Sequence, residues 1–185
     1  GQASTCELGA EGLDPNQPVT IGACDNGMLY DSELFNELMS DDLVDVIVWG
    51  ARGYPGARRS PEMYGWIEAD TETKNIYSVS VKEPLEDPVR DPIIVGVFTF
   101  KRLGDFLDAT KSMKKRKAFV NGEYYVDMCI NDAIKSGLNC KLFEIDKYIC
   151  WGTPNDLRTF EYWQSCFDKW SSHPYPMKAD KNFHT

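Results

Sequence analysis

The sequence is poor in histidine and in positive charge. Only two of its 185 residues are histidine, and 20 lysines and arginines face 29 aspartates and glutamates, which leaves a formal net charge of -9. Surfaces that bind nucleic acid or anionic lipid need a basic patch, so this balance argues against both as general partners. It leaves open a nucleotide pocket, where a metal ion and a few local cations decide binding. The one dense basic run, Lys111–Lys117, is interpreted as the solvated end of a helix, with phosphate contact as the alternative.

The sequence also lacks paired cysteines and long apolar runs. No two cysteines form a Cys-x-x-Cys pair, so a zinc site is not expected. No apolar run is long enough to span a bilayer, and no secretory signal peptide is recognisable. We therefore expect no membrane partner and a reducing, cytoplasmic location. The six cysteines are Cys6, Cys24, Cys129, Cys140, Cys150 and Cys166.

The composition is that of an ordinary globular domain. Hydrophobic residues make up 42% of the chain and charged residues 26%, which excludes a disordered protein. The length is sufficient for one domain with a real core. We expect an α/β domain over residues 1–170 and a polar tail over residues 171–185. The chain begins at Gly1 without methionine, so we expect a domain that is incomplete at its N-terminus.

Segments typical of strands alternate with segments typical of helices. Short β-branched or apolar runs predict strands, and apolar residues at helical spacing predict helices. This alternation predicts a mixed, mainly parallel sheet flanked by helices. Residues 64–69 and 76–81 flank a polar turn and predict a hairpin, and residues 52–61 are interpreted as a mobile, cationic loop. The predicted strands are residues 19–24, 44–49, 64–69, 76–81, 93–100, 140–145 and 148–150. The predicted helices are residues 31–39, 102–113, 123–135 and a last one that opens at Thr153-Pro154.

An aspartate directly follows the first predicted strand. The apolar run Val19–Cys24 ends at Asp25, and Asn26-Gly27 comes next. In open α/β sheets, ligands bind beyond the carboxyl ends of the strands. Asp25 therefore stands where a magnesium ion with phosphates would be held. The alternative is a simple turn in which the aspartate bonds to nearby backbone, and this segment alone favours the turn.

Four more segments hold residue types that structure alone does not demand, and each has a structural alternative. Gly65, inside a predicted strand, indicates close approach of a ligand or a bulge. Lys82, at a strand end, is a candidate catalytic cation or a surface lysine. Glu123 is a candidate ligand residue or a partner of a helix dipole. Gly152-Thr153-Pro154 is a candidate site turn or merely a helix start.

The order of these segments resembles that of the sugar-1-phosphate nucleotidyltransferases, the family that makes nucleotide sugars. Cys24-Asp25-Asn26 corresponds to a strand end in that family whose aspartate binds magnesium. Tyr64-Gly65-Trp66-Ile67-Glu68-Ala69-Asp70 corresponds to a strand that lines the sugar site. Lys82-Glu83-Pro84 carries, in swapped order, an acid and a lysine that contact sugar and phosphate. The resemblance implies a Rossmann-like nucleotide-diphospho-sugar transferase fold.

The remaining matches lie at both ends of the chain and in its middle. Gly96 matches a glycine inside a strand, and Gly122-Glu123 matches a Gly-Glu helix start. Gly152-Thr153 matches a turn before the last helix. The opening Gly1-Gln2-Ala3-Ser4-Thr5 resembles a small-residue segment that contacts the nucleotide base. The resemblance extends from Gly1 to about Trp170 and rests on order rather than on any one motif.

Two departures from the family pattern concern catalysis. The family's glycine-rich loop, which cradles the nucleotide phosphates and ends in a lysine, has no counterpart because the match begins downstream of it. Cys150 stands where many members have the aspartate that is the second magnesium ligand. A thiol is a poor partner for a hard cation that prefers oxygen, and Asp146 is the nearby substitute. We therefore expect weak activity or none from this chain alone.

The reaction that the resemblance implies is phosphoryl-type transfer in polysaccharide biosynthesis. A sugar 1-phosphate attacks the α-phosphate of a nucleoside triphosphate, and pyrophosphate leaves. Asp25 would hold Mg²⁺ and Lys82 would neutralise the sugar phosphate. The residues implied to bind substrate are Gly1, Ala3, Asn26, Tyr64, Gly65, Glu83, Gly96 and Glu123.

Three other interpretations stay open. A glycosyltransferase that uses nucleotide sugars would usually hold its metal with Asp-x-Asp, and Asp25-Asn26-Gly27 lacks the second acid. A sugar- or nucleotide-binding module that has lost catalysis is favoured by Cys150 and by the missing loop. An α/β fragment without a ligand is the structural alternative. A missing first strand would leave a sheet edge exposed, so a homo-oligomer or a partner segment is also expected as an alternative to a monomer.

Overall fold

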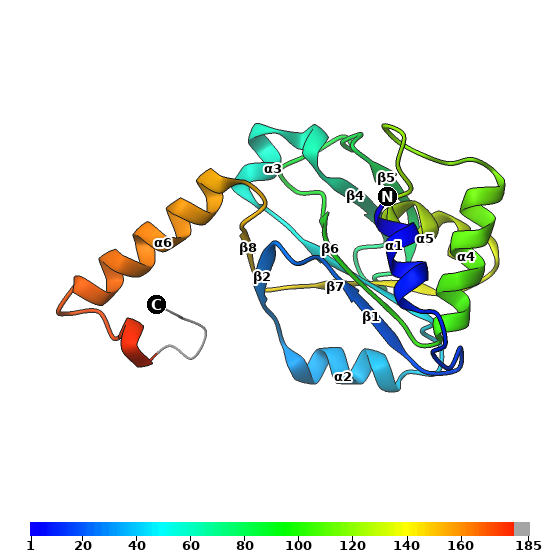
Figure 1. The fold of residues 1–185 in the computed structure, drawn as a ribbon, viewed down its shortest axis with the longest axis horizontal. Coiled ribbons are helices and arrows are strands. Elements are labelled where there is room, and N and C mark those ends of the chain that lie inside the picture. The colour runs from blue at the N-terminus through cyan, green and yellow to red at the C-terminus, as the bar shows by residue number, and fades with distance from the viewer. Residues whose placement is uncertain (180–185) are drawn as a thin grey trace. The chain divides into compact units, whose positions relative to one another are not determined.

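The computed structural model describes residues 1–179, and the contacts among residues divide the chain into two compact units. Among the described residues, the larger unit holds residues 1–23 and 28–148, and the smaller holds residues 24–27 and 149–179. The predicted domain boundary at residue 170 stays a prediction. The helices of the larger unit are α1 (Gln2–Gly9), α2 (Ser32–Ser40), α3 (Pro55–Arg59), α4 (Leu103–Lys115) and α5 (Val126–Lys135) (Figure 1).

The larger unit is built on one mixed sheet. Its strands are β1 (Val19–Gly22), β3 (Val46–Ala51), β4 (Gly65–Ala69), β5 (Ile76–Val81), β6 (Ile93–Phe100) and β7 (Cys140–Glu144). The strand order is β5-β4-β6-β3-β7, and β1 pairs with β6. β6 is antiparallel to β1, β3 and β4, whereas β3 and β7 are parallel. β1, β3, β4 and β7 therefore share one direction, although β3 and β7 are the one parallel pair among the strand pairs of this sheet. The predicted α/β fold with a mixed sheet is confirmed.

Helices cover both faces of this sheet because its central strands are apolar on both sides. In β3, Val46 and Val48 join the core under α1, α4 and α5, whereas Ile47 and Trp49 join the core under α2 and α3. Both sets are almost fully buried. This two-sided burial explains why β3 has a continuous apolar run rather than an alternating one.

The tip of the β4–β5 hairpin is anchored on β7. The amide of Leu142 donates to the Lys74 carbonyl at 2.9 Å, and Glu144 binds Lys74 at 2.7 Å and Arg52 at 3.0 Å. Burial alone would raise the pKa of Glu144, but these two cations lower it. Within the turn, bonds from the Thr73 backbone and hydroxyl lower the pKa of Asp70 to about 2. The predicted hairpin is confirmed.

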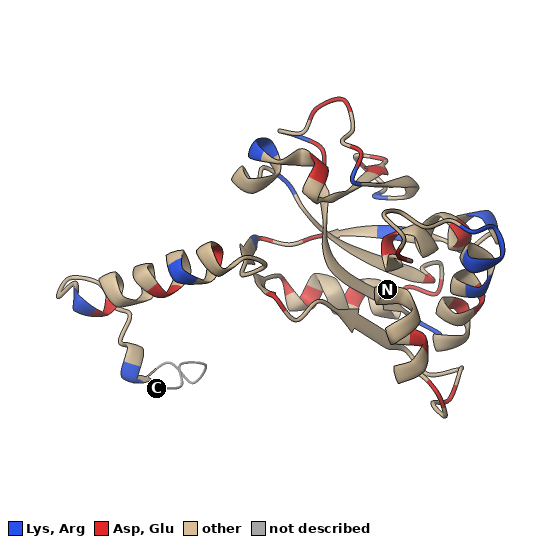
Figure 2. Ribbon diagram, turned by 45° about the horizontal axis from the view of Figure 1, so that its top comes forward, with Lys and Arg blue, Asp and Glu red and all other residues tan. Residues whose placement is uncertain are grey.

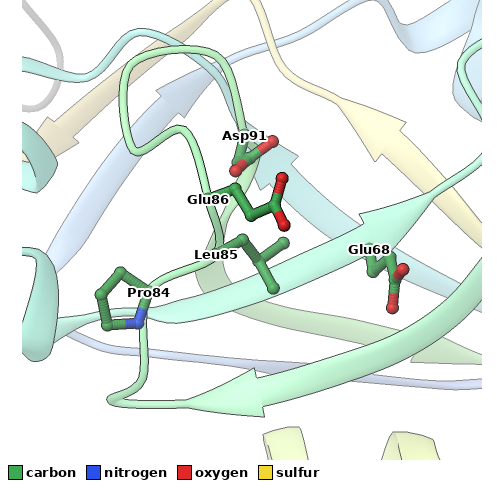
Figure 3. A pocket seen from close by; sticks show the side chains of 5 residues that line it. All are labelled: Glu68, Pro84, Leu85, Glu86 and Asp91. Carbon is green, nitrogen blue, oxygen red and sulfur yellow. The ribbon is translucent and has the colours of Figure 1, made fainter.

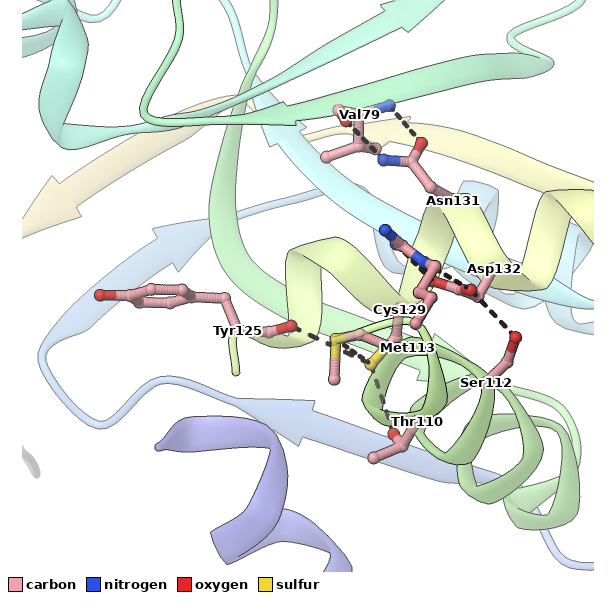
Figure 4. Close-up of polar contacts among 9 residues, drawn as sticks. Val79, Thr110, Ser112, Met113, Tyr125, Cys129, Asn131 and Asp132 are labelled. Atoms are coloured by element: carbon pink, nitrogen blue, oxygen red, sulfur yellow. Dashed lines mark hydrogen bonds and ion pairs between the residues drawn. The ribbon is translucent and has the colours of Figure 1, made fainter. Parts of the chain in front are cut away.

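Helix α5 is held to its neighbours by polar contacts as well as by its apolar face. The Asn131 side chain bonds to both the amide and the carbonyl of Val79 in β5, at 2.9 and 2.7 Å (Figure 4). Asp132, only 3% exposed, accepts bonds from Ser112 at 3.0 Å and from the Arg116 guanidinium at 2.6 Å. The second bond raises the pKa of Arg116. These contacts join α5 to β5 and to the end of α4.

Most predicted boundaries shift by one or two residues, and two regions differ more. The expected mobile loop at residues 52–61 contains α3 and a 3₁₀ helix, Pro61–Met63. Pro55 occupies a first-turn position of α3, where proline fits a helix. α5 begins at Val126 rather than at Glu123, because the preceding Asn121 and Gly122 take positive φ values of 51° and 79° and form a tight turn. The basic run predicted as a helix end does lie at the end of α4 (Figure 2).

The smaller unit consists mainly of α6 (Pro154–Lys169) and a 3₁₀ helix, Met177–Ala179. α6 starts as predicted, with Thr153 as N-cap and a hydroxyl that accepts from the Asp156 amide at 3.2 Å. β2 (Asn26–Leu29) pairs with β8 (Lys147–Cys150). β2 is an error of the sequence interpretation, which assigned Asn26-Gly27 to a turn.

Candidate functional site

Two predicted residues, Gly65 and Lys82, meet where the β4–β5 hairpin ends. The Lys82 amide donates to the Tyr64 carbonyl at 3.0 Å, which continues the pairing of Gly65 with Val81. Lys82 takes a φ of 60°, a left-handed conformation that costs a residue other than glycine about 1–3 kcal/mol. Its ammonium lies 5.3 Å from the centroid of the Tyr125 ring, within cation–π distance. The hairpin end therefore holds a cation in a defined place.

A half-buried aspartate that the sequence interpretation did not select lies beside Gly65. A Cβ added to Gly65 would fall 2.3 Å from Oδ2 of Asp127. Asp127 is in the first turn of α5. Burial raises its pKa to about 6, against the opposing effects of its own backbone amide and of Lys82. The sequence signal was an acid at a helix start, a pattern too common to distinguish Asp127 from a dipole partner.

A second group of predicted residues meets at the start of α1. The Ala3 amide donates to the Tyr124 carbonyl at 3.0 Å. A Cβ on Gly1 would lie 2.9 Å from the Tyr124 nitrogen and 3.1 Å from Cβ of Glu123. The structure thus brings Gly1, Ala3 and Glu123 together, although residues 3 and 123 are far apart in sequence. Glu123 itself is exposed and precedes α5 instead of opening it.

The other predicted residues of the larger unit are more scattered. Gly96 has a φ of 74°, and the pairing of β3 with β6 changes register around it. The glycine therefore allows a local bulge in the strand. Its carbonyl accepts from the Ala23 amide at 2.9 Å. Tyr64 packs edge-on against Tyr54, with ring centroids 5.9 Å apart. Glu83 is exposed just beyond the hairpin. No ligand role of these residues follows from their packing.

The smaller unit contains Asp25 and Asn26. The Asp25 carbonyl accepts from the Trp151 amide at 2.8 Å. A Cβ on Gly152 would lie 3.2 Å from Oδ2 of Asp25 and 3.5 Å from Sγ of Cys150. The carboxylate and the thiol therefore both lie beside Gly152, just before α6 begins. The Asp25 side chain is exposed. Asn26 is the first residue of β2.

The side chains around Asp25 supply only some of the ligands that a magnesium ion requires. Mg²⁺ is typically held by one or two carboxylates together with substrate phosphates. Asp25 supplies one such carboxylate. Cys150 offers sulfur, and its Sγ lies 3.9 Å from an Asp156 oxygen already bonded to Thr153 at 2.7 Å. No cluster of three or more histidine, cysteine or acidic side chains with metal-binding geometry occurs in residues 1–179.

A hollow of about 580 Å³ lies between the β4–β5 hairpin and the segment that leaves it (Figure 3). Its lining includes the carboxylates of Glu68, Glu86 and Asp91. Glu68 accepts from the Ser78 hydroxyl at 2.7 Å, and Asp91 accepts from the Asp87 amide at 2.8 Å. Three acids repel phosphate, so this hollow does not suit an anionic substrate. None of the helices within residues 1–179 is long and apolar enough to cross a membrane.

This architecture also occurs in proteins of known structure. No family model matches the sequence, and no curated protein matches it. Solved structures do match. A nucleoside-diphosphate-sugar pyrophosphorylase from Vibrio cholerae RC9 superposes with a TM-score of 0.67 at 20% identity, over 86% of this chain and 64% of its own. The chain has a nucleotidyltransferase-like fold.

Two more structures with this nucleotidyltransferase-like fold act on different substrates. The inositol-1-phosphate CTP transferase of T. maritima matches with a TM-score of 0.59 at 13% identity, over 86% of this chain and 59% of its own. A CMP:2-keto-3-deoxy-manno-octonic acid synthetase, solved with CTP, matches with a TM-score of 0.61 at 12% identity, over 90% and 68%. The chain therefore spans about three fifths to two thirds of the length of these structures.

Proposed function

We propose that this chain carries part of a site for nucleotidyl transfer from a nucleoside triphosphate to a sugar 1-phosphate, releasing pyrophosphate. The observation that supports the proposal most is the fold, which the chain shares with a nucleotide-sugar pyrophosphorylase over most of its own length. A second support is the order of Asp25, Gly65, Lys82 and Glu123 along that fold. The chain spans only 64% of that neighbour's length, so the comparison supports the fold, and the reaction is proposed.

In this proposal each residue binds or orients a reactant. Asp25 would hold Mg²⁺, which offsets the charge of the triphosphate when bound. Lys82 neutralises the phosphate of the sugar substrate, which places the nucleophilic oxygen near the α-phosphate. Glu83 or Glu123 accepts hydrogen bonds from sugar hydroxyls. The remaining proposed contacts are those of Gly1 and Ala3 with the base, and of Asn26, Tyr64, Gly65 and Gly96 with substrate.

Mg²⁺-dependent nucleotide binding tests the role of Asp25. We expect the full chain to be stabilised by a nucleoside triphosphate with Mg²⁺ in a thermal shift assay, and Asp25→Asn to lose most of that stabilisation. The matched control is Asp42→Asn, which removes a carboxylate from another exposed loop position. Equal stabilisation of wild type and Asp25→Asn would remove Asp25 from the proposal.

Turnover distinguishes the proposed reaction from its alternatives. Pyrophosphate release from a triphosphate and a sugar 1-phosphate indicates nucleotidyl transfer, whereas sugar transfer from a nucleotide sugar indicates a glycosyltransferase. We expect weak pyrophosphate release or none, since Cys150 offers a soft donor to a hard cation. Rapid synthesis of a nucleotide sugar by these 185 residues would contradict this expectation.

Cys150 also favours a second candidate function, a module that binds nucleotide or sugar phosphate without turning it over. The substitution Cys150→Asp separates the two candidates. If the metal site is otherwise intact, this variant gains Mg²⁺-dependent pyrophosphate release over wild type. Binding of the triphosphate without any gain in release supports the binding module.

A further inference from the structure

The mixed sheet of the larger unit has edges at β5, β7 and β1, and other parts of the chain block two of them. On β5, the Asn131 side chain bonds to the amide and the carbonyl of Val79, at 2.9 and 2.7 Å (Figure 4). On β7, the amide of Leu142 donates to the Lys74 carbonyl of the hairpin turn at 2.9 Å. Proteins block strand edges in such ways because a bare edge pairs with other chains. The third edge, on β1, differs.

β1 presents unused backbone groups at residues 20 and 22. Among the described strands it pairs with β6 alone, and beyond its end the Ala23 amide donates to the Gly96 carbonyl at 2.9 Å. Bonded and non-bonded pairs alternate along an antiparallel ladder, so Thr20 and Gly22 direct their amides and carbonyls away from β6. The Thr20 hydroxyl lies 3.0 Å from that of Thr99, as the closer side chains of a non-bonded pair allow. Thr20 and Gly22 are exposed, and nothing within residues 1–179 bonds to these outward groups.

An apolar hollow of about 250 Å³ lies beside the same strand. It is lined by Val19 and Ile21 of β1, by Phe106 of α4, and by α1 together with Leu13, and none of its lining residues is charged. Leu13 is 57% exposed, and a Cβ added to Gly22 would meet nothing within 4 Å. A strand placed beside β1 would therefore find apolar surface that the larger unit leaves uncovered.

The two faces of β1 differ in character. Val19 and Ile21 pack against the core under α1 and α4. On the opposite face Thr20 contacts the Thr99 hydroxyl, which also accepts a bond from the Trp49 indole at 3.1 Å. A strand that pairs with β1 continues both faces, because side chains alternate along a strand. Such a strand would need apolar residues at every second position and polar residues such as threonine between them.

The charges beside the hollow favour a basic segment over a second copy of this chain. Glu11 and Asp14, next to Leu13 in the loop that leads to β1, are exposed and belong to none of the ion pairs among residues 1–179. Glu7 of α1, by contrast, is paired with Lys114. Pairing two copies through β1 would bring two sets of these acids together in chains that each carry a net charge of -9, and like charges repel. A segment with lysine or arginine at its ends is attracted instead.

We propose that the edge of β1 accepts an extended segment of another polypeptide, in which apolar and polar residues alternate and lysine or arginine stands at the ends. Backbone bonds to Thr20 and Gly22 supply affinity, and the alternating apolar side chains enter the hollow, as in other cases of strand addition. The terminal cations meet Glu11 and Asp14. This inference goes beyond nucleotidyl transfer and uses none of the residues proposed for that reaction.

The edge is tested with a labelled synthetic peptide of alternating valine and threonine that has lysines at both ends. Fluorescence anisotropy measures its affinity for the full chain and for two variants of Gly22. Gly22→Pro removes the outward amide but no bond to β6, a change that edge strands tolerate, whereas Gly22→Ala keeps the amide and has room for its Cβ. We expect binding to be about tenfold weaker in Gly22→Pro and unchanged in Gly22→Ala. No binding by wild type, or equal affinity of all three proteins, overturns the proposal.

The hollow and the charges beside it are tested by two further changes. Leu13→Ser should weaken binding of the peptide, whereas the matched control Leu43→Ser, at a leucine 76% exposed in the turn after α2, should not. A second peptide, with glutamates in place of its terminal lysines, should bind more weakly than the first. Equal binding of the two peptides contradicts the proposed basic partner.

Hydrogen exchange in wild type locates the peptide without any variant, and it decides the matter if Gly22→Pro does not fold. The Thr20 and Gly22 amides should exchange rapidly in the free protein, and the lysine-ended peptide should slow them at least about tenfold. The Ile21 amide, which faces β6, should change less. Peptide binding without this protection overturns the proposal. So does protection of both amides in a dimer that forms without peptide, because it assigns the edge to a second copy.

Discussion

Substituting Asp127 by asparagine should change how the stability of the protein depends on pH. Burial raises the pKa of Asp127 in the folded chain from 3.8 to about 6. Between these values the folded state binds a proton that the unfolded state does not, so the group favours folding most at low pH. That contribution is lost as the pH rises through about 6. Asparagine does not ionise and therefore does not suffer this loss.

The size of the effect follows from the pKa shift. A shift of about two units corresponds to about 3 kcal/mol when the whole range is crossed, and about 2 kcal/mol falls between about pH 4 and about pH 8. Asp127 is half-buried, so most of this value should be retained. Relative to wild type, Asp127→Asn should therefore gain about 2 kcal/mol of unfolding free energy from the lower to the higher pH.

Urea unfolding of both proteins at these two pH values measures the difference directly. Other titrating groups are common to both proteins, so their effects cancel in the comparison. Asp42→Asn, at an exposed loop position, should leave the pH dependence as in wild type, whereas Lys82→Met should make it steeper because the lysine charge lowers the pKa of Asp127. A wild-type-to-Asp127→Asn difference that is the same at both pH values would refute the reasoning.

Three further substitutions test the packing around this region, each by urea unfolding. Gly65→Ala should cost about 1–3 kcal/mol, since its Cβ would meet the Asp127 carboxylate at 2.3 Å, whereas Gly22→Ala in β1 has open space and should cost little. Glu144→Gln should cost about 1 kcal/mol at neutral pH and less in acid, because the pKa of Glu144 is lowered in the folded state and its contribution is lost as the pH falls. Asp132→Asn should cost about 2 kcal/mol, because it breaks a pair whose acid is 3% exposed.

The sheet was predictable because its strands carry their own signal. β3 and β6 are apolar on both faces, and such runs predict buried strands without knowledge of their neighbours. The hairpin of β4 and β5 was predictable for a similar reason, since a polar turn separates two β-rich segments. The predictions were wrong where backbone conformation sets the boundary of an element. At Asn121 and Gly122, positive φ values form a turn, and α5 begins only after it. The periodicity of apolar residues gives no sign of such a turn.

The candidate site was predictable only in part, because its contacts depend on tertiary structure. Gly65 and Lys82 are 17 positions apart in sequence, and the hairpin brings them together as expected. Asp127 reaches Gly65 only because α5 packs against β5, through the bonds of Asn131 to Val79. A first-turn aspartate by itself is typical of many helices. Its burial against a glycine of another element is what distinguishes it.

Gly65 shows that the group approaching a strand at a glycine can come from the same chain. The sequence interpretation took the glycine as a place where a ligand approaches β4 or where the strand bulges. In the structure the group that approaches is a carboxylate of the same chain, 2.3 Å from the absent Cβ. Gly65→Ala should therefore change the titration of the Asp127 carboxyl as well as stability, whereas a glycine needed only for its backbone conformation would affect stability alone.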